Sequence, residues 1–177
     1  MFGVSNWTVD RIREANRYAE ENGLDGFSVS SPNFGLARQM ADLWGGGCVT
    51  VSGPEHEADR AWYAQSGMPV IAYSSLGRGF FSGKFRSDDP QGAERVLDLY
   101  ARKGYLYPEN LRRLCKAEEL AERYGETVPE IAMRYVFSHP MNVFAVVSTI
   151  DPKRLDSSVR AAGNPLTAED VSELERA

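Results

Sequence analysis

Residues 69 to 85 read PVIAYSSLGRGFFSGKF, and this stretch joins an apolar run to a loop rich in glycine and serine. The apolar residues 69 to 73 are typical of a buried strand. Hydroxyl groups, glycines and the basic residues Arg78 and Lys84 follow directly. Exposed backbone N–H groups and cationic side chains together suit phosphate groups. The stretch therefore predicts a strand that ends in an anion-binding loop.

The rest of the chain alternates short β-rich runs with amphipathic helices, as in a parallel α/β layer. Strands are predicted at 2 to 4, 27 to 30, 69 to 73 and 143 to 148, and the run 48 to 51 is either a strand or an extended loop. Helices are predicted after the caps Thr8, Thr127, Asp151 and Thr167 and from Pro54 and Pro108. The segment 74 to 107 is long for a connector, which predicts a functional or mobile loop.

Roughly four βα units fit into the 177 residues, whereas a closed eight-stranded barrel needs about 250. Periodicity leaves two folds open, an open doubly wound sheet or half of a barrel. The dinucleotide motif G-x-G-x-x-G does not follow any predicted strand, and residues 77 to 83 approach it only loosely. An unrelated hydrolase is disfavoured because no G-x-S-x-G elbow occurs.

Composition narrows the classes of function. The formal charge is −5, and basic residues are interspersed with acidic ones, which argues against a nucleic-acid partner. No apolar stretch approaches the roughly 20 residues of a membrane span, and the opening residues lack the features of a signal peptide, so we expect a cytoplasmic protein without a membrane partner. Cys48, Cys115, His56 and His139 have no neighbours at ligand spacing, so no metal is predicted.

Three polar clusters follow predicted strands, where the active-site groups of α/β folds collect. They are Ser5 with Asn6, the run 73 to 78, and Ser148 and Thr149 with Arg154. An amide suits a carboxamide, an aromatic face suits a planar ring, and a helix start suits an anion. Each cluster also has a purely structural interpretation, as a turn and cap, a core aromatic residue and a solvated helix residue.

Three ordered motifs resemble the later strand-end motifs of aldo-keto reductases. They are G-V-S-N-W at 3 to 7, A-Y-S-S-L-G-R-G-F-F-S-G-K-F at 72 to 85, and P-x-x-L-D at 152 to 156 followed by N-P-L-T-A-E-D at 164 to 170. The resemblance covers essentially the whole chain. It implies an α/β fold of the TIM-barrel type, with residues 1 to 177 forming a single partial domain from about strand 5 to strand 8 with their helices.

The resemblance also implies a site for NADP or NAD. Ser5 and Asn6 would hold the nicotinamide carboxamide, and Tyr73 would stack on the ring. The residues implied at the phosphates and the adenosine end are Ser74, Leu76, Gly77, Arg78, Lys84, Ser148, Thr149, Arg154 and Ser158. The chain departs from many relatives at Ser31, where they carry a Gln beside the carboxamide, at Ser148, where a basic residue is common, and at 157 to 158, where a Glu-Asn pair is common. The choice between NAD and NADP is therefore open.

The implied activity is reduction of aldehydes or ketones, with this chain as the cofactor-binding half. The family's Asp, Tyr, Lys and His tetrad lies on earlier strands, so no catalytic residue is predicted here and the chain alone is expected to be inactive. His56 would lie on the wrong face of the barrel. The alternative is a non-catalytic half-barrel that binds a nucleotide or oligomerises, motivated by Met1 directly preceding the first strand. Open strand edges would then favour self-association or a partner chain that completes the barrel.

Overall fold

The computed structural model describes residues 2–43 and 45–177, so Met1 and Trp44 lie outside the described residues. Across the described chain, four short strands form one parallel sheet in the order β1-β2-β3-β4. They are β1 (Val4–Ser5), β2 (Ser30–Ser31), β3 (Val70–Ala72) and β4 (Val143–Ala145). Val4 pairs with Ser30, Ser30 with Val70, and Val70 with Val143. Since all pairs are parallel, the carboxyl ends of the strands meet at one edge of the sheet.

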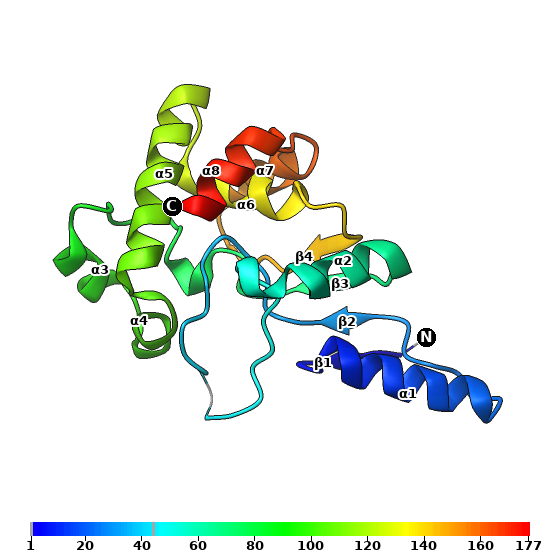
Figure 1. Cartoon of the computed structure of the whole chain (residues 1–177). Helices are drawn as coiled ribbons and strands as arrows, with labels where there is room; N and C mark the ends of the chain where they lie inside the picture. The colour runs from blue at the N-terminus through cyan, green and yellow to red at the C-terminus, as the bar shows by residue number, and fades with distance from the viewer. Residues whose placement is uncertain (1, 44) are drawn as a thin grey trace.

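Helices connect and cover these strands. They are α1 (Val9–Glu21), α2 (Glu57–Ser66), α3 (Pro90–Val96), α4 (Leu99–Tyr105), α5 (Pro108–Tyr124), α6 (Val128–Phe137), α7 (Pro152–Ala162) and α8 (Ala168–Arg176), with 3-10 turns at Pro54–His56 and Gly77–Gly79. Figure 1 shows α1 beside β1, at the opposite end of the molecule from α5. Helix α6 contacts α5, α7 and β4. The chain therefore winds progressively from the β1 end of the sheet to the β4 end.

The helix starts follow the capping residues that the sequence predicts. Thr8 accepts a hydrogen bond from the Arg11 N–H, and Thr167 accepts one from the Asp170 N–H. Thr127 forms a reciprocal capping box at the start of α6, with Glu130 as its partner. These side chains bind N–H groups that have no partner within the first turn of a helix. The predicted starts of α1, α6 and α8 are thus confirmed.

Several predicted boundaries differ from the structure. The strand predicted at 27 to 30 is β2 at Ser30–Ser31, and the strand predicted at 143 to 148 ends at Ala145. The run 48 to 51 is an extended loop that forms one isolated bridge, Thr50 with Asn33. The segment 74 to 107 contains α3 and α4, so the prediction of one long loop was wrong. The β-propensity of the residues is a poor guide to strand boundaries, because hydrogen-bond pairing with the neighbouring strand decides where a short strand ends.

The apolar core joins the sheet to the helices that cover it. Val70 and Ala72 of β3 are fully buried, as are Leu114 of α5 and Ile131 of α6, all in one cluster. The predicted buried strand is thus confirmed at its centre. Burial of this apolar surface is the main favourable contribution to folding.

The opposite face and the edges of the sheet are less covered. Ile71 is 38% exposed between its buried neighbours, and Phe144 beside it is 56% exposed. Within the described chain, β1 and β4 each pair with a strand on one side only. None of the described helices is both long and apolar enough to cross a membrane. The fold is an α/β layer with two open strand edges.

Candidate functional site

A cavity of about 980 Å³ lies where the loop after β3, the segment after β4 and the first turns of α6 and α7 approach one another. Eight of the residues that the sequence singles out line it: Ser74, Leu76, Arg78, Lys84, Ser148, Thr149, Arg154 and Ser158. These residues come from two strand ends that are far apart in the sequence. The parallel sheet brings them together because β3 and β4 are neighbours.

Three non-glycine residues of the described chain have a positive φ, and all three were singled out from the sequence. Asn6 has a φ of 57°, Ser74 of 54° and Arg78 of 52°. This left-handed region is sparsely populated by residues other than glycine, and such strain collects at functional sites. The backbone geometry therefore marks the ends of β1 and β3 independently of any motif.

The loop after β3 turns tightly at Gly77. A Cβ atom there would lie 2.9 Å from the Cβ of Ala37 and 3.0 Å from that of Phe80, and the φ of 59° also favours glycine. Arg78 follows and donates to the carboxylate of Asp98 at 2.8 Å. Asp98 also caps α4, so the arginine is held against the folded 74 to 107 segment. The tight turn at Gly77 and the ion pair with Asp98 thus hold Arg78 in a defined position in the loop.

Two hydroxyl groups in the cavity wall have no hydrogen-bond partner among the described residues. Ser75 is 3% exposed, and its Oγ and the Oγ of Ser82 are both buried and unpaired. Both residues line the cavity. A buried hydroxyl without a partner is costly, so a polar ligand at this position would be favoured. Both serines belong to the motif at 72 to 85, and neither was predicted as a site residue.

The start of α7 forms another wall. Asp151 caps this helix by accepting from the Lys153 N–H at 3.0 Å, and its own N–H donates to the Thr149 hydroxyl at 3.1 Å. The Ser158 hydroxyl donates back to the carbonyl of Arg154 at 3.0 Å. The Arg154 side chain itself is largely exposed at the cavity. It also lies 3.6 Å from the Asp151 carboxylate, so Arg154 is a partly paired cation of this wall that is still exposed to an anion in the cavity.

Lys153 and Arg160 were missed, and Ser157 was noted only as a departure from relatives, although the spacing of four and three residues places all three on one face of α7. They line the cavity with Glu130 of α6. Burial alone would raise the pKa of Glu130, but hydrogen bonds from Thr127 and Arg160 lower it to about 2. The helical period of the sequence would have found the three α7 residues, whereas the Glu130 contact crosses between helices.

A second cluster of predicted residues lies at the ends of β1, β2 and β3, beside the cavity. The Asn6 Oδ1 accepts from the Val49 N–H at 3.0 Å and from the Tyr73 hydroxyl at 2.6 Å. The Ser5 hydroxyl donates to the Ser31 carbonyl at 3.1 Å, and the Ser31 hydroxyl donates to the Ile71 carbonyl at 2.8 Å. These four predicted residues therefore tie neighbouring strands together. Gly77, the remaining predicted residue, shapes the loop backbone.

The hydroxyl of Tyr73, the aromatic residue of this cluster, is a weaker acid than that of an ordinary tyrosine. Burial, together with the nearby Cys48 thiol, raises the pKa of Tyr73 above its ordinary value of 10.0. The Tyr73 carbonyl accepts from the Asn33 side chain at 3.3 Å, and the same Asn33 amide donates to the Tyr105 hydroxyl at 3.1 Å. Asn33 is buried, and it was missed because a lone Asn in a polar run resembles a turn residue.

The histidines lie away from the cavity. The Nδ1 of His56 lies 2.8 Å from a carboxylate oxygen of Asp59 and forms a hydrogen bond with it at the start of α2. His139 packs against the rings of Phe34 and Tyr135, and burial lowers its pKa to about 4. Among the described residues, no group of three or more His, Cys, Asp or Glu side chains is arranged to hold a metal.

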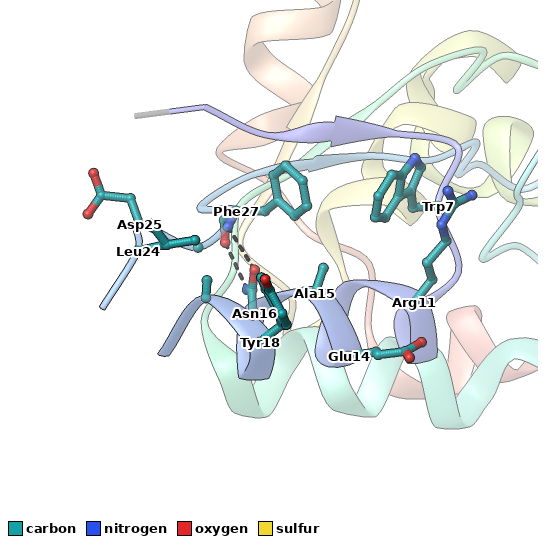
Figure 2. Close-up of a pocket in the computed structure, with 11 residues that line it drawn as sticks. Trp7, Arg11, Glu14, Ala15, Asn16, Tyr18, Leu24, Asp25 and Phe27 are labelled. Atoms are coloured by element: carbon teal, nitrogen blue, oxygen red, sulfur yellow. Dashed lines mark hydrogen bonds between the residues drawn. The ribbon is translucent and has the colours of Figure 1, made fainter. Parts of the chain in front are cut away.

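A smaller hollow of about 450 Å³ lies between α1 and residues 24 to 27. Figure 2 shows Asn16 reaching from α1 to the backbone of Phe27, where it makes two hydrogen bonds of 2.7 and 3.0 Å. Arg11 packs over the Trp7 ring at 3.8 Å. None of the residues predicted to bind the cofactor lines this hollow. Its side chains fasten α1 to the edge of the sheet.

Comparison with known proteins agrees with these observations. A model of the aldo/keto reductase family matches residues 1–177. An aryl-alcohol dehydrogenase of Pestalotiopsis microspora is 27% identical over 98% of this chain and 40% of its own length. An aldo-keto reductase of Strobilurus tenacellus is 24% identical over 62% of this chain and 33% of its own length.

The fold is also similar to that of a solved structure. A thermostable aldo-keto reductase, crystallised with the inhibitor epalrestat, matches with a TM-score of 0.59 and 17% identity. The match covers 98% of this chain and 47% of that protein. The matched region thus covers less than half the length of each of these relatives.

Proposed function

The chain belongs to the aldo/keto reductase family, and on that premise we propose that it forms the cofactor-binding half of an NAD(P)H-dependent reductase of aldehydes or ketones. In this proposal its four strands correspond to strands 5 to 8 of a TIM-type barrel. The observation that carries the proposal is the cavity of about 980 Å³, into which the loop after β3 and the start of α7 both turn their polar side chains. The carboxyl ends of barrel strands are where such sites form.

The chemistry of the lining fits a dinucleotide. The unpaired Ser75 and Ser82 hydroxyls and the Arg78 and Lys84 side chains suit its phosphate groups. Arg154 and Thr149 suit the adenosine end. When bound, the cofactor would supply the hydride for carbonyl reduction. Either NADP or NAD is compatible with this set of residues.

The strand-end cluster would orient the nicotinamide. Tyr73 offers a ring face for stacking, and its hydroxyl fixes the side chain of Asn6. Because the Asn6 oxygen already accepts two hydrogen bonds and one amide N–H donates to the Ser5 hydroxyl at 3.3 Å, we assign the other amide N–H the contact with the carboxamide. Ser5 and Ser31 would support this geometry by holding adjacent strands, since their hydroxyls bind backbone carbonyls.

The proton donor would lie outside these residues. The raised pKa of Tyr73 makes its hydroxyl a poor acid, and this hydroxyl is already engaged with Asn6. We therefore place the family's Asp, Tyr, Lys and His tetrad on the earlier barrel strands and expect this chain to be inactive alone. The similarity to an aryl-alcohol dehydrogenase suggests aromatic aldehydes as the first substrates to test with the whole protein. Val96 and Leu97 of the 74 to 107 segment line the cavity proposed for the cofactor.

The test is a titration of the purified chain with NADPH and with NADH, followed by cofactor fluorescence and tryptophan quenching. Saturable binding that weakens about tenfold or more in Arg154→Ala supports the proposal, because a charge-assisted contact contributes about 1.5–3 kcal/mol. An exposed arginine outside the cavity, Arg13, provides the control variant Arg13→Ala, which should bind as the wild type does. Absence of binding by the folded chain would overturn the proposal.

A second candidate function is a non-catalytic half-barrel that pairs with another chain or with itself. The observation in its favour is the pair of open strand edges with exposed apolar side chains, Phe144 among them. A surface of this kind favours association. Cofactor binding and association are separate measurements, so the two candidates are distinguishable.

A further inference from the structure

Glu130 is the only carboxylate among the described residues that line the cavity. Five basic side chains line the same cavity: Arg78, Lys84, Lys153, Arg154 and Arg160. Asp98 and Asp151 pair with Arg78 and Arg154 from outside this lining, whereas Glu130 lines the cavity itself, where a negative charge opposes the binding of anions.

Contacts from two helices hold the Glu130 carboxylate in place. One of its oxygens accepts from the Thr127 N–H and the Thr127 hydroxyl, each at 2.8 Å. The other accepts from Arg160 of α7 at 3.1 Å. The carboxylate is 15% exposed, whereas the arginine is 67% exposed. Glu130 thus neutralises one cation of the cavity and keeps its own charge beside it.

We propose that Glu130 is a specificity-determining residue of this cavity, which pairs with Arg160 and thereby selects against cofactors that carry an additional phosphate group. The inference rests on the proposed dinucleotide site. Its physical basis is that repulsion from a fixed carboxylate grows with the negative charge of the ligand. NADPH differs from NADH by one phosphate group, so Glu130 disfavours NADPH more than NADH.

The charge of Glu130 can be separated from its capping role. A glutamine at the third helical position also completes a capping box, so Glu130→Gln keeps the start of α6 while removing the charge. A purely structural effect would alter the binding of both cofactors by the same factor. An electrostatic effect would alter their ratio, and it would weaken as the salt concentration rises.

The test compares the affinities of the full chain for NADPH and NADH in Glu130→Gln, Arg160→Gln and the double variant. Glu130→Gln should tighten NADPH binding by about three- to tenfold, the size expected for unit charges separated by a cavity of this kind. It should tighten NADH binding by less. Arg160→Gln should weaken NADPH binding more than NADH binding, and the double variant should return towards the wild-type ratio.

An unchanged NADPH to NADH ratio in both single variants, or a change by one common factor for both cofactors, would overturn the inference. Glu169→Gln, at an exposed position on α8, is the control and should leave the ratio as it is. Thermal unfolding confirms that each variant is folded, and Arg160→Gln still provides the test if Glu130→Gln does not fold. If the wild-type chain binds neither cofactor, both the proposed function and this inference fail; if it binds and only the ratio is unmoved, this inference alone fails.

Discussion

The amide oxygen of Asn6 accepts two hydrogen bonds within the protein, from the Val49 N–H and from the Tyr73 hydroxyl. The sequence indicates that an asparagine at a strand end offers both a donor and an acceptor. It does not indicate which of these remain available, because Val49 and Tyr73 reach Asn6 only through the folding of separate segments. Residue types at the site were thus predictable from the motifs, whereas their hydrogen-bond partners were not. The same holds for Asn33, which supports the Tyr73 carbonyl from a neighbouring strand end.

At this scale we predict the effect of Tyr73→Phe. The variant removes the 2.6 Å hydrogen bond to Asn6 and keeps the aromatic face. Loss of a part-buried hydrogen bond should lower the free energy of unfolding by about 1 kcal/mol. Cofactor affinity should also fall, because Asn6 loses one of its two anchors, while the stacking face is retained. Denaturant unfolding and cofactor titration measure the two effects. Full stability and full affinity in Tyr73→Phe would show that the hydroxyl does not position Asn6.

At the scale of the element, helix starts were predictable and the folding of the 74 to 107 segment was not. Thr127 and Glu130 have a local spacing that reveals the capping box directly. Helices α3 and α4 have caps too, since Asp89 accepts from Gly92 and Asp98 from Ala101. Each of these helices has only seven residues and contains a glycine. Such short helices are marginal alone and depend on tertiary packing, which the local sequence does not reveal.

The capping box of α6 predicts a dependence of stability on pH. The pKa of Glu130 is lowered from 4.5 to about 2, so the folded state favours the ionised carboxylate. Its contribution to stability, up to about 3 kcal/mol, is complete above pH 4.5 and is lost as the pH falls towards 2. Glu130→Gln should therefore lose less stability than the wild type across this range. Denaturant titration at each pH measures the free energy of unfolding, and its slope against pH is compared between the wild type and Glu130→Gln. Parallel slopes would contradict the assigned contacts.

At the scale of the whole molecule, a parallel α/β layer was predictable from alternating strand and helix patterns. Those patterns could not distinguish an open sheet from part of a barrel, because both use the same βα units. The ordered family motifs predicted part of a barrel. The chain is similar in fold to a solved aldo-keto reductase, and its correspondence to strands 5 to 8 stays a prediction. The chain spans less than half of that protein, and its sheet has an exposed strand at each edge.

These edges predict that the chain associates in solution. Phe144 lies on β4 and is 56% exposed, next to the exposed Ile71 on β3. Apolar side chains on an open edge favour strand pairing between molecules, and a lysine there opposes it. Sedimentation velocity over a range of concentrations should detect association in the wild type and less of it in Phe144→Lys. The wild type as a single monomeric species at every concentration would contradict this prediction.

We propose that the loop after β3 and the start of α7 bind one dinucleotide between them. Hydrogen–deuterium exchange of the full chain, measured with and without saturating NADPH, tests this claim most directly. We predict slower exchange in residues 74 to 84 and in residues 149 to 158 together, with little change in α1, which lies at the other end of the sheet. Protection of neither segment, or protection centred on the hollow beside α1, would contradict the account.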